Sequence, residues 1–247
     1  MNVVILCGGK GTRIRGVDDR VPKPMITVGD LPIVVHIMQR YAKFGHRRFI
    51  LCLGYLGNVI SEYFGSTFPS TSSEIRFLLP DGIAIDIVLA NTGEESMTGS
   101  RVAQIQDHVN GDFMLTYGDG VSDVAIDQLV QFHQTHDCAM TLTAVRPPSR
   151  FGEVQVDNRG IATSFNEKPQ ASSGLISGGF FVCRSSVFEY LRKDASLVLE
   201  AEPMREMVKR RSLAAFVHPG FWQCMDTYRD WELLNDLERS GKAPWRL

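Results

Sequence analysis

The sequence predicts an α/β fold built on a doubly wound, mostly parallel β-sheet. Apolar runs of strand length alternate with amphipathic segments through the first 145 residues. The first run, residues 2–6 (NVVIL), is apolar on both faces, as buried parallel strands are. A repeated strand-then-helix order implies right-handed crossovers. The chain of 247 residues, 44% of them hydrophobic, is long enough to bury one large core.

The first half supplies most of the expected elements. A helix is expected over residues 29–45, with Asp30 as its N-cap, Pro32 in its first turn and Gly45 as its stop. Further strands are expected at residues 48–54, 112–120 and 139–145, and further helices at residues 57–64, 98–109 and 127–136. Loops that follow the parallel strands then share one edge of the sheet, where such folds bind ligands.

The second half has a looser pattern. From about residue 146 the strands become shorter, at residues 152–157, 160–167 and 176–183, and a closing helix is expected over residues 230–241. No linker, internal repeat or low-complexity tract separates the halves. We therefore expect a single domain over residues 1–247, with a Rossmann-like half at residues 1–145 and an integrated, smaller half at residues 146–247.

Positive charge is concentrated near the start of the chain. The formal net charge is −2, yet residues 1–25 carry five basic side chains against two acidic ones. A focused cationic patch indicates a small anionic ligand, whereas a broad basic face would indicate nucleic acid. We expect no nucleic-acid partner.

The cysteines and apolar runs bear on location. Five cysteines are widely separated, mostly within apolar runs, and form no CxxC pair, which is typical of reduced core residues in a cytoplasmic protein. The opening apolar run is too short for a signal sequence, and no later run approaches the about 18 residues of a membrane span. We expect a cytoplasmic protein without a membrane partner.

A glycine-rich, basic loop follows the first strand. Gly8, Gly9 and Gly11 let backbone N–H groups point at an anion, and Arg13 and Lys23 add positive charge. A plain tight turn would explain one or two of the glycines but not the two basic residues beside a proline-rich return. The Walker sequence is absent, and the dinucleotide fingerprint fails because Ile14 stands where its third glycine is required. The loop therefore predicts a phosphate site of another kind.

The segment Gly8–Met25, with GGxGTR followed by PKPM, resembles the signature of the sugar-1-phosphate nucleotidylyltransferases. The resemblance covers essentially the whole chain, because further motifs follow in the family's order: MTGSR (97–101), YGDG (117–120), RFGEV (150–154), FNEKP (165–169), ISGGFF (176–181) and GFWQCMDT (220–227). Within the family these segments are most similar to those of members that transfer CMP from CTP to glucose 1-phosphate. The resemblance thus implies an enzyme that makes a nucleotide sugar and pyrophosphate.

The resemblance also implies a role for particular residues. Arg13 and Lys23 would be catalytic, and Asp119 and Asp226 would hold Mg²⁺. The nucleotide would contact Leu6, Gly8, Gly9, Gly11, Thr12, Thr98, Gly99, Arg101 and Gly118. The sugar phosphate would contact Gly152, Glu167, Lys168, Gly178, Gly179 and Trp222, in the sugar-binding second half. A nucleoside triphosphate and a sugar 1-phosphate are the expected partners, and a homo-oligomer is the expected assembly.

The chemistry needs cations more than proton transfer. A phosphate oxygen of the sugar phosphate attacks the α-phosphorus of the triphosphate, and pyrophosphate leaves in line. A phosphate monoester is already anionic at neutral pH, so no general base is required. The obstacle is repulsion between two polyanions, which Arg13, Lys23 and Mg²⁺ would relieve.

Several residues have a simpler interpretation. Asp119 precedes a glycine and could form only a turn. Glu167 and Lys168 could form an exposed ion pair, and Trp222 could belong to the core. The HxxH spacing of residues 133–136 could suggest zinc, but no further ligand cluster accompanies it, and a solvated helix face explains it.

The base and the acceptor are less determined than the reaction. Arg101 could donate to the O2 and N3 acceptors of cytosine. However, Ser100 stands where the family has glycine, and the segment between EYF and NTGEES is shorter than usual. A uridylyl- or thymidylyltransferase, a transferase with a non-sugar acceptor, and a non-catalytic nucleotide-sensing module are the alternatives.

Overall fold

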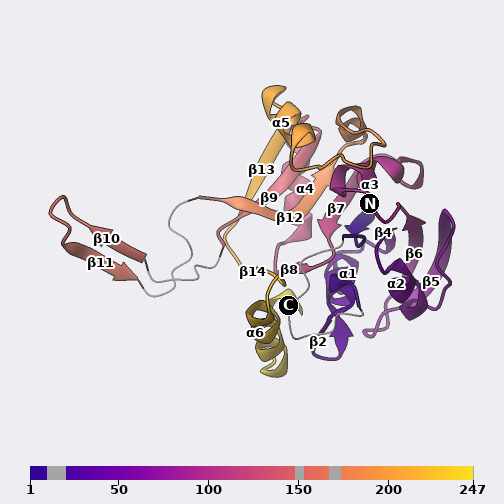
Figure 1. Cartoon of the computed structure of the whole chain (residues 1–247), viewed down its shortest axis with the longest axis horizontal. Helices are drawn as coiled ribbons and strands as arrows, with labels where there is room; N and C mark the ends of the chain where they lie inside the picture. The colour runs from indigo at the N-terminus through magenta and orange to yellow at the C-terminus, as the bar shows by residue number, and fades with distance from the viewer. Residues whose placement is uncertain (10–20, 148–152, 167–173, 247) are drawn as a thin grey trace.

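The structure is a computed structural model that describes residues 1–9, 21–147, 153–166 and 174–246. In these residues, eight strands form one sheet (Figure 1). Their order across the sheet is β13 (Leu213–His218), β9 (Met140–Val145), β12 (Ile176–Cys183), β7 (Phe113–Tyr117), β1 (Asn2–Leu6), β4 (Arg48–Leu53), β6 (Ala84–Asn91) and β5 (Ser72–Leu78). The sheet therefore combines strands from both halves of the chain.

The strand directions confirm the predicted α/β class with a mostly parallel sheet. Strands β7, β1, β4 and β6 are parallel neighbours, and β13 is parallel to β9. Strand β12 runs antiparallel to both of its neighbours, and β5 runs antiparallel to β6 at the edge. The insertion of β12 between β7 and β9 places second-half residues beside the ends of first-half strands. The single-domain organisation over residues 1–247 stays a prediction.

Alternate residues of β1 pack into two separate cores. Val3 and Ile5 belong to one buried cluster, and Val4 and Leu6 belong to the other. Helix α1 (Ile33–Lys43) packs into the first cluster, and α3 (Thr98–Gln104) contributes Val102 to the second. Because successive side chains of a strand point to opposite faces, an apolar strand needs a cover on each side. This is the doubly wound layering that the sequence predicts.

The start of α1 differs from the prediction. Asp30 is not the N-cap, because it lies between two short antiparallel strands, β2 (Thr27–Val28) and β3 (Leu31–Pro32). Gly29 forms the turn with a φ of 61°, so the chain turns back before the helix begins. Pro32 is the capping residue rather than part of the first turn. The predicted stop is confirmed, since Gly45 follows the helix with a φ of 84°.

Most other predicted helices are confirmed with shifted ends. Helix α2 spans Gly57–Tyr63, α4 spans Ile126–Gln134 and α6 spans Tyr228–Arg239. The predicted helix at residues 98–109 is divided into α3 and a 3₁₀ turn at Gln106–His108. Helix α6 begins earlier than predicted because Thr227 and Asp230 form a capping box. A further helix, α5, spans Glu202–Lys209.

Two small pairings complete the described chain. Strand β8 (Gly120–Ser122) pairs with β14 (Trp222–Cys224), which joins the YGDG segment to the GFWQCMDT segment. Strands β10 (Glu153–Val156) and β11 (Ala162–Asn166) form a hairpin that stands apart from the large sheet (Figure 1). All five cysteines are free thiols. Across the described ranges, none of the helices is both long and apolar enough to span a membrane.

Candidate functional site

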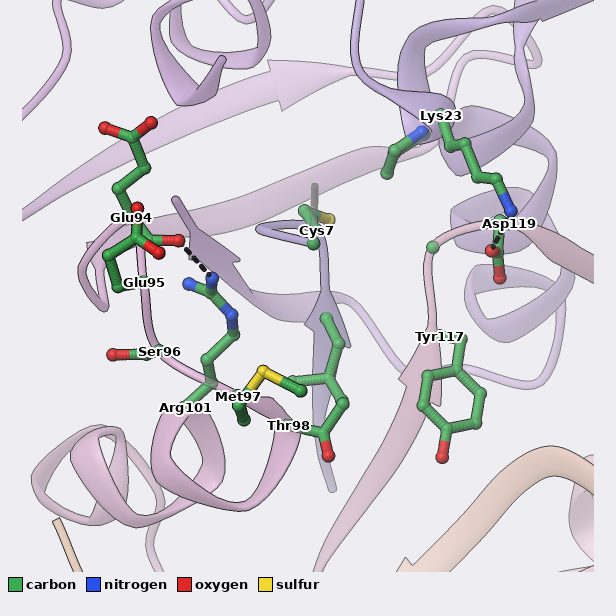
Figure 2. Close-up of a pocket in the computed structure, with 14 residues that line it drawn as sticks. Cys7, Lys23, Glu94, Glu95, Ser96, Met97, Thr98, Arg101, Tyr117 and Asp119 are labelled. Carbon is green, nitrogen blue, oxygen red and sulfur yellow. Dashed lines mark hydrogen bonds and ion pairs between the residues drawn. The ribbon is translucent and has the colours of Figure 1, made fainter. Parts of the chain in front are cut away.

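A cavity of about 410 Å³ opens at the carboxyl ends of β1 and β7 (Figure 2). We call it the larger cavity. It is lined by Leu6, Cys7, Gly9, Lys23, Pro24, residues 94–98, Arg101 and residues 117–119. Its position is the one at which α/β sheets bind ligands, and it collects the first-strand loop, MTGSR and YGDG in one place.

Two of the predicted nucleotide glycines are required by close packing. A Cβ on Gly118 would lie 3.1 Å from the Leu6 carbonyl oxygen and 2.9 Å from Pro24. A Cβ on Gly8 would lie 2.3 Å from the Arg101 guanidinium. Gly118 lines the larger cavity, whereas Gly8 is not among its lining residues. Both positions therefore need glycine whatever the ligand is.

Lys23 lies between the two predicted metal ligands. Its Nζ is 2.5 Å from Asp226 Oδ1 and 3.5 Å from Asp119 Oδ2. Asp226 is brought there by the β8–β14 ladder, which continues in a bond from Met225 N to the Asp119 carbonyl at 2.8 Å. The structure thus brings together three residues that the sequence predicts for the phosphate site.

The charges in this corner influence one another. Burial opposes the charge on Lys23, but the hydrogen bond to Asp226 and the charges of both aspartates outweigh it and raise the pKa of Lys23. Burial also raises the pKa of Asp119; the Lys23 ammonium opposes that rise and the Asp226 carboxylate adds to it. The ammonium is therefore firmly charged and serves as the counter-ion of two carboxylates.

The donor set of this corner fits Mg²⁺. Asp119 and Asp226 both reach one cation, the Lys23 ammonium, so their oxygens converge on a single position. Mg²⁺ is commonly held by one or two carboxylates, with phosphate oxygens and water as its other ligands. Within the described ranges, no group of three or more His, Cys, Asp or Glu could hold a metal from the protein alone. A divalent ion here would complete its coordination with water or with oxygens of the substrates.

Arg101 occupies the opposite side of the larger cavity and is 2% exposed. Its donors are directed at the chain itself. Nη1 donates to Leu53 O at 3.0 Å, Thr92 Oγ1 at 2.7 Å and Gly93 O at 2.8 Å, and Nη2 donates to Gly8 O at 2.7 Å and Glu94 O at 3.3 Å. These bonds tie the ends of β1, β4 and β6 together. The expected donation to cytosine is not supported, because both terminal nitrogens already have partners.

A smaller cavity of about 40 Å³ adjoins the first. It is lined by the predicted sugar residues Gly178, Gly179 and Trp222. The Trp222 indole N–H donates to the Gly178 carbonyl at 2.6 Å, so this side chain braces the cavity wall. Tyr117 and Asp119 line both cavities. Asp119 therefore stands where ligands of the two cavities would meet.

The comparison with known families decides the class of protein. The model of a family described as nucleotidyl transferase matches residues 2–227. The chain belongs to this family. Nucleotidyl transferases generally use a divalent metal ion, and nucleotide and sugar phosphate substrates fit the family.

Two relatives that match this nucleotidyl transferase over its whole length are both named as glucose-1-phosphate cytidylyltransferases, one of them as probable. A glucose-1-phosphate cytidylyltransferase of Salmonella typhimurium is 41% identical, with 100% of this chain and 99% of the relative covered. A protein of Bacillus subtilis, named as a probable glucose-1-phosphate cytidylyltransferase, is 38% identical, with both chains covered at 100%.

Solved structures agree on the fold. HddC from Yersinia pseudotuberculosis, complexed with GMP-PN, has a TM-score of 0.67 at 20% identity, with 95% of this chain and 98% of that chain covered. A second crystal structure of HddC from the same organism has a TM-score of 0.66 at the same identity and coverage. At this identity the likeness shows the shared architecture alone.

The remaining predicted residues of the nucleotidyl transferase fall into three groups. Thr98 lines the larger cavity, and Gly99 packs behind it against Leu197. The histidines at residues 133 and 136 lie outside both cavities, where each contacts Thr141. The expected solvated helix face is wrong for His133, which is fully buried. Six predicted residues lie outside the described ranges: Gly11, Thr12, Arg13, Gly152, Glu167 and Lys168.

Sequence reasoning missed Glu200, and it gave no role to the thiol of Cys224. The Glu200 carboxylate accepts hydrogen bonds from Thr98 and Tyr117, which both line the larger cavity. Cys224 Sγ donates to Asp226 Oδ2 at 3.2 Å. The sequence around Glu200 contains no phosphate, metal or sugar signal, so only the folded chain brings it to the site.

Proposed function

We propose that this nucleotidyl transferase transfers CMP from CTP to glucose 1-phosphate, which gives CDP-glucose and pyrophosphate. The observation that carries the chemistry is the Lys23, Asp119 and Asp226 corner at the junction of the two cavities. The choice of CTP and glucose 1-phosphate is supported by the 41% and 38% identical relatives, which match over the whole chain.

The reaction follows from charge and position. The nucleotide occupies the larger cavity with its phosphates near Lys23, and the sugar phosphate approaches from the smaller cavity. Its phosphate oxygen attacks the α-phosphorus, and pyrophosphate leaves in line. Lys23 places positive charge beside the phosphates as negative charge shifts to the leaving group. Mg²⁺, held by Asp119 and Asp226, would neutralise phosphate charge when bound.

The other predicted contacts belong to the same proposal. Arg13 would share the leaving pyrophosphate with Lys23, and Gly9, Gly11 and Thr12 would receive the triphosphate. Glu167 would accept sugar hydroxyls, Lys168 would meet the sugar phosphate, and Gly152 would form part of the sugar pocket. The base would contact residues 94–98 of the cavity wall, because Arg101 already donates its hydrogen bonds to backbone carbonyls.

The decisive experiment is a substrate panel. Pyrophosphate release is measured with CTP, UTP, dTTP and GTP, each paired with glucose 1-phosphate and with other sugar 1-phosphates. We expect the highest kcat/KM for CTP with glucose 1-phosphate. A higher kcat/KM with UTP or dTTP would overturn the cytidylyl assignment and leave the nucleotidyl transfer chemistry in place.

The same panel separates the rival functions. A nucleotide-sensing module would bind a nucleotide in calorimetry but release no pyrophosphate with any acceptor. A transferase with a non-sugar acceptor would consume CTP only with another phosphorylated alcohol. The Asp226→Asn variant is the negative control, since it should retain the cavities but lose a proposed metal ligand.

A further inference from the structure

The Glu200 carboxylate joins two hydroxyl groups from different parts of the cavity wall. Thr98 Oγ1 donates to Glu200 Oε2 at 2.7 Å, and the Tyr117 hydroxyl donates to Glu200 Oε1. Thr98 is the first residue of α3, and Tyr117 is the last residue of β7. The carboxylate thus connects the start of a helix to the end of a strand.

Backbone contacts hold Glu200 in place. The segment 194–201 crosses the N-terminal end of α3 and is attached there by three bonds: Met97 N to Ala195 O at 2.8 Å, Ser100 N to Leu197 O at 3.1 Å, and Leu199 N to Thr98 Oγ1 at 2.9 Å. A Cβ on Gly99 would lie 3.0 Å from the Leu197 carbonyl oxygen, so glycine permits this close approach. The position of Glu200 is therefore set by the main chain beside it.

Tyr117 is the part of the wall that both cavities share. It lines the larger and the smaller cavity, and a Cβ on Gly179 would lie 2.4 Å from its ring. The ring also meets Phe181 edge to face, with 5.8 Å between the centroids. From this shared wall the Tyr117 hydroxyl donates to Glu200.

We infer that Glu200 is a positioning residue for nucleotidyl transfer, which fixes the shared wall through Thr98 and Tyr117. This inference rests on the proposed function. In-line attack needs the reacting oxygen and phosphorus about 3–3.5 Å apart, and a displacement of about 1 Å can cost about 100-fold in rate. A wall that contacts both ligands controls that distance. Loss of Glu200 should therefore lower kcat more than it raises either KM.

A double-mutant cycle tests the inference. Glu200→Ala and Tyr117→Phe each remove the same contact, so each should lower kcat about 10-fold to 100-fold. The double variant should be no slower than the slower single variant, because the second change removes nothing further from that contact. Glu200→Gln should recover most of the rate, since its amide oxygen accepts from Tyr117 and its N–H₂ group donates to Thr98.

Glu202→Ala is the matched control. Glu202 is a nearby carboxylate at the start of α5, but it pairs with Arg192 at 2.8 Å on the surface. It should leave kcat and both KM values unchanged. Multiplicative losses in the Glu200 and Tyr117 double variant, or a Gln variant as slow as Ala, would overturn the inference.

The cycle is measured with the nucleotide and sugar phosphate that the wild-type enzyme prefers in the panel. If that pair is not CTP and glucose 1-phosphate, the substrate proposal fails and the cycle still decides the role of Glu200. If the preferred pair is as proposed and the cycle is multiplicative, only the role of Glu200 fails.

Discussion

Two basic residues on opposite sides of the larger cavity have different partners (Figure 2). Lys23 contacts two carboxylates, Asp119 and Asp226. Arg101 contacts backbone carbonyls at the ends of three strands. A metal ion can take the two carboxylates from Lys23, and phosphates can then become its partners, but nothing that binds can replace a carbonyl of the sheet. Lys23 is suited to chemistry, and Arg101 is suited to architecture.

This difference predicts which property, turnover or stability, a substitution on each side of the cavity impairs. Substitutions of Lys23, Asp119 or Asp226 should lower turnover with little loss of stability. The two aspartate side chains are partly exposed, at 30% for Asp119 and 47% for Asp226, so little buried contact is lost. Changes at Arg101 should cost stability first, because its side chain is 2% exposed and its partners are buried carbonyls. Changes at the two aspartates, at Lys23 and at Arg101 test this contrast.

The largest effect is expected for the carboxylates. Asp119→Asn or Asp226→Asn should lower kcat by about 1,000-fold or more, because a site with two protein ligands loses half of its charge. The fold should persist, as shown by circular dichroism. Asp236→Asn is the control, since Asp236 pairs with Arg239 on the surface of α6. A near-normal rate in either variant at ordinary Mg²⁺ concentrations would remove that residue from the metal site.

Lys23→Met should fail in catalysis and yet bind metal more tightly. Loss of the ammonium should lower kcat about 100-fold or more with a smaller change in KM, since its charge matters most as pyrophosphate leaves. Without nucleotide, however, the ammonium competes with a divalent ion for the two carboxylates. The variant should therefore bind Mn²⁺ about tenfold more tightly, about 1.4 kcal/mol.

Electron paramagnetic resonance of free Mn²⁺ measures that affinity without turnover. Lys242→Met is the control for loss of a positive charge, because Lys242 lies beyond the end of α6. Weaker Mn²⁺ binding by the Lys23 variant, or a change in KM alone, would contradict the role of Lys23 as the exchangeable partner.

Local pattern explains what the sequence predicts well. Strands β1, β4 and β7 and helices α1, α2 and α4 follow from apolar periodicity within each segment. Asp30 failed as a cap because the neighbouring residues pair as β2 and β3, which a single helical pattern does not reveal. Strands β5, β6 and β13 and helix α5 were not predicted. Strands β5 and β13 and helix α5 are partly exposed, and β6 and β13 have parallel partners, β4 and β9, that are distant in sequence.

The site was predicted where a motif supplied the information. The pairing of Asp119 with Asp226 depends on the β8–β14 ladder and was expected only from the family resemblance. Arg101 was expected to face a base because a sequence does not distinguish a solvated guanidinium from a buried one. Its burial depends on carbonyls of Gly8, Leu53 and Gly93, which converge only in the folded sheet. Glu200 had no motif at all.

Arg101→Ala should destabilise the protein rather than change its base preference. The change removes a buried guanidinium with five hydrogen bonds, and the carbonyls of Gly93 and Glu94 lose their donor, whereas those of Leu53 and Gly8 keep backbone donors. At about 1–3 kcal/mol for each unsatisfied group, the free energy of unfolding should fall by about 3 kcal/mol or more. Urea unfolding measures this loss. Arg101→Lys should recover little, because an ammonium lacks the planar fork. A variant of normal stability with an altered CTP:UTP ratio would show that Arg101 reads the base after all.

The smallest effect is expected for His133, a buried basic residue that lies outside both cavities. His133 is 0% exposed, and its Nδ1 contacts Thr141 Oγ1 at 2.7 Å. Burial, with the Arg184 and His136 charges, lowers the pKa of His133 to about 4 from an ordinary 6.5, and Asp112 only partly opposes this. The unfolded chain therefore binds the proton more readily than the folded chain between about pH 6.5 and pH 4, and stability falls as the pH falls through that range. Between pH 7.5 and pH 5 the titration of His133 should lower the free energy of unfolding by about 2 kcal/mol.

The His133→Asn variant, which can keep the bond to Thr141, should lose correspondingly less stability than the wild type in urea unfolding at the two pH values. Equal losses in the two proteins would show that His133 is protonated as readily in the folded chain as in the unfolded one. In that case the charge of His133 would affect neither turnover nor stability, whereas the charge of Lys23 would affect turnover.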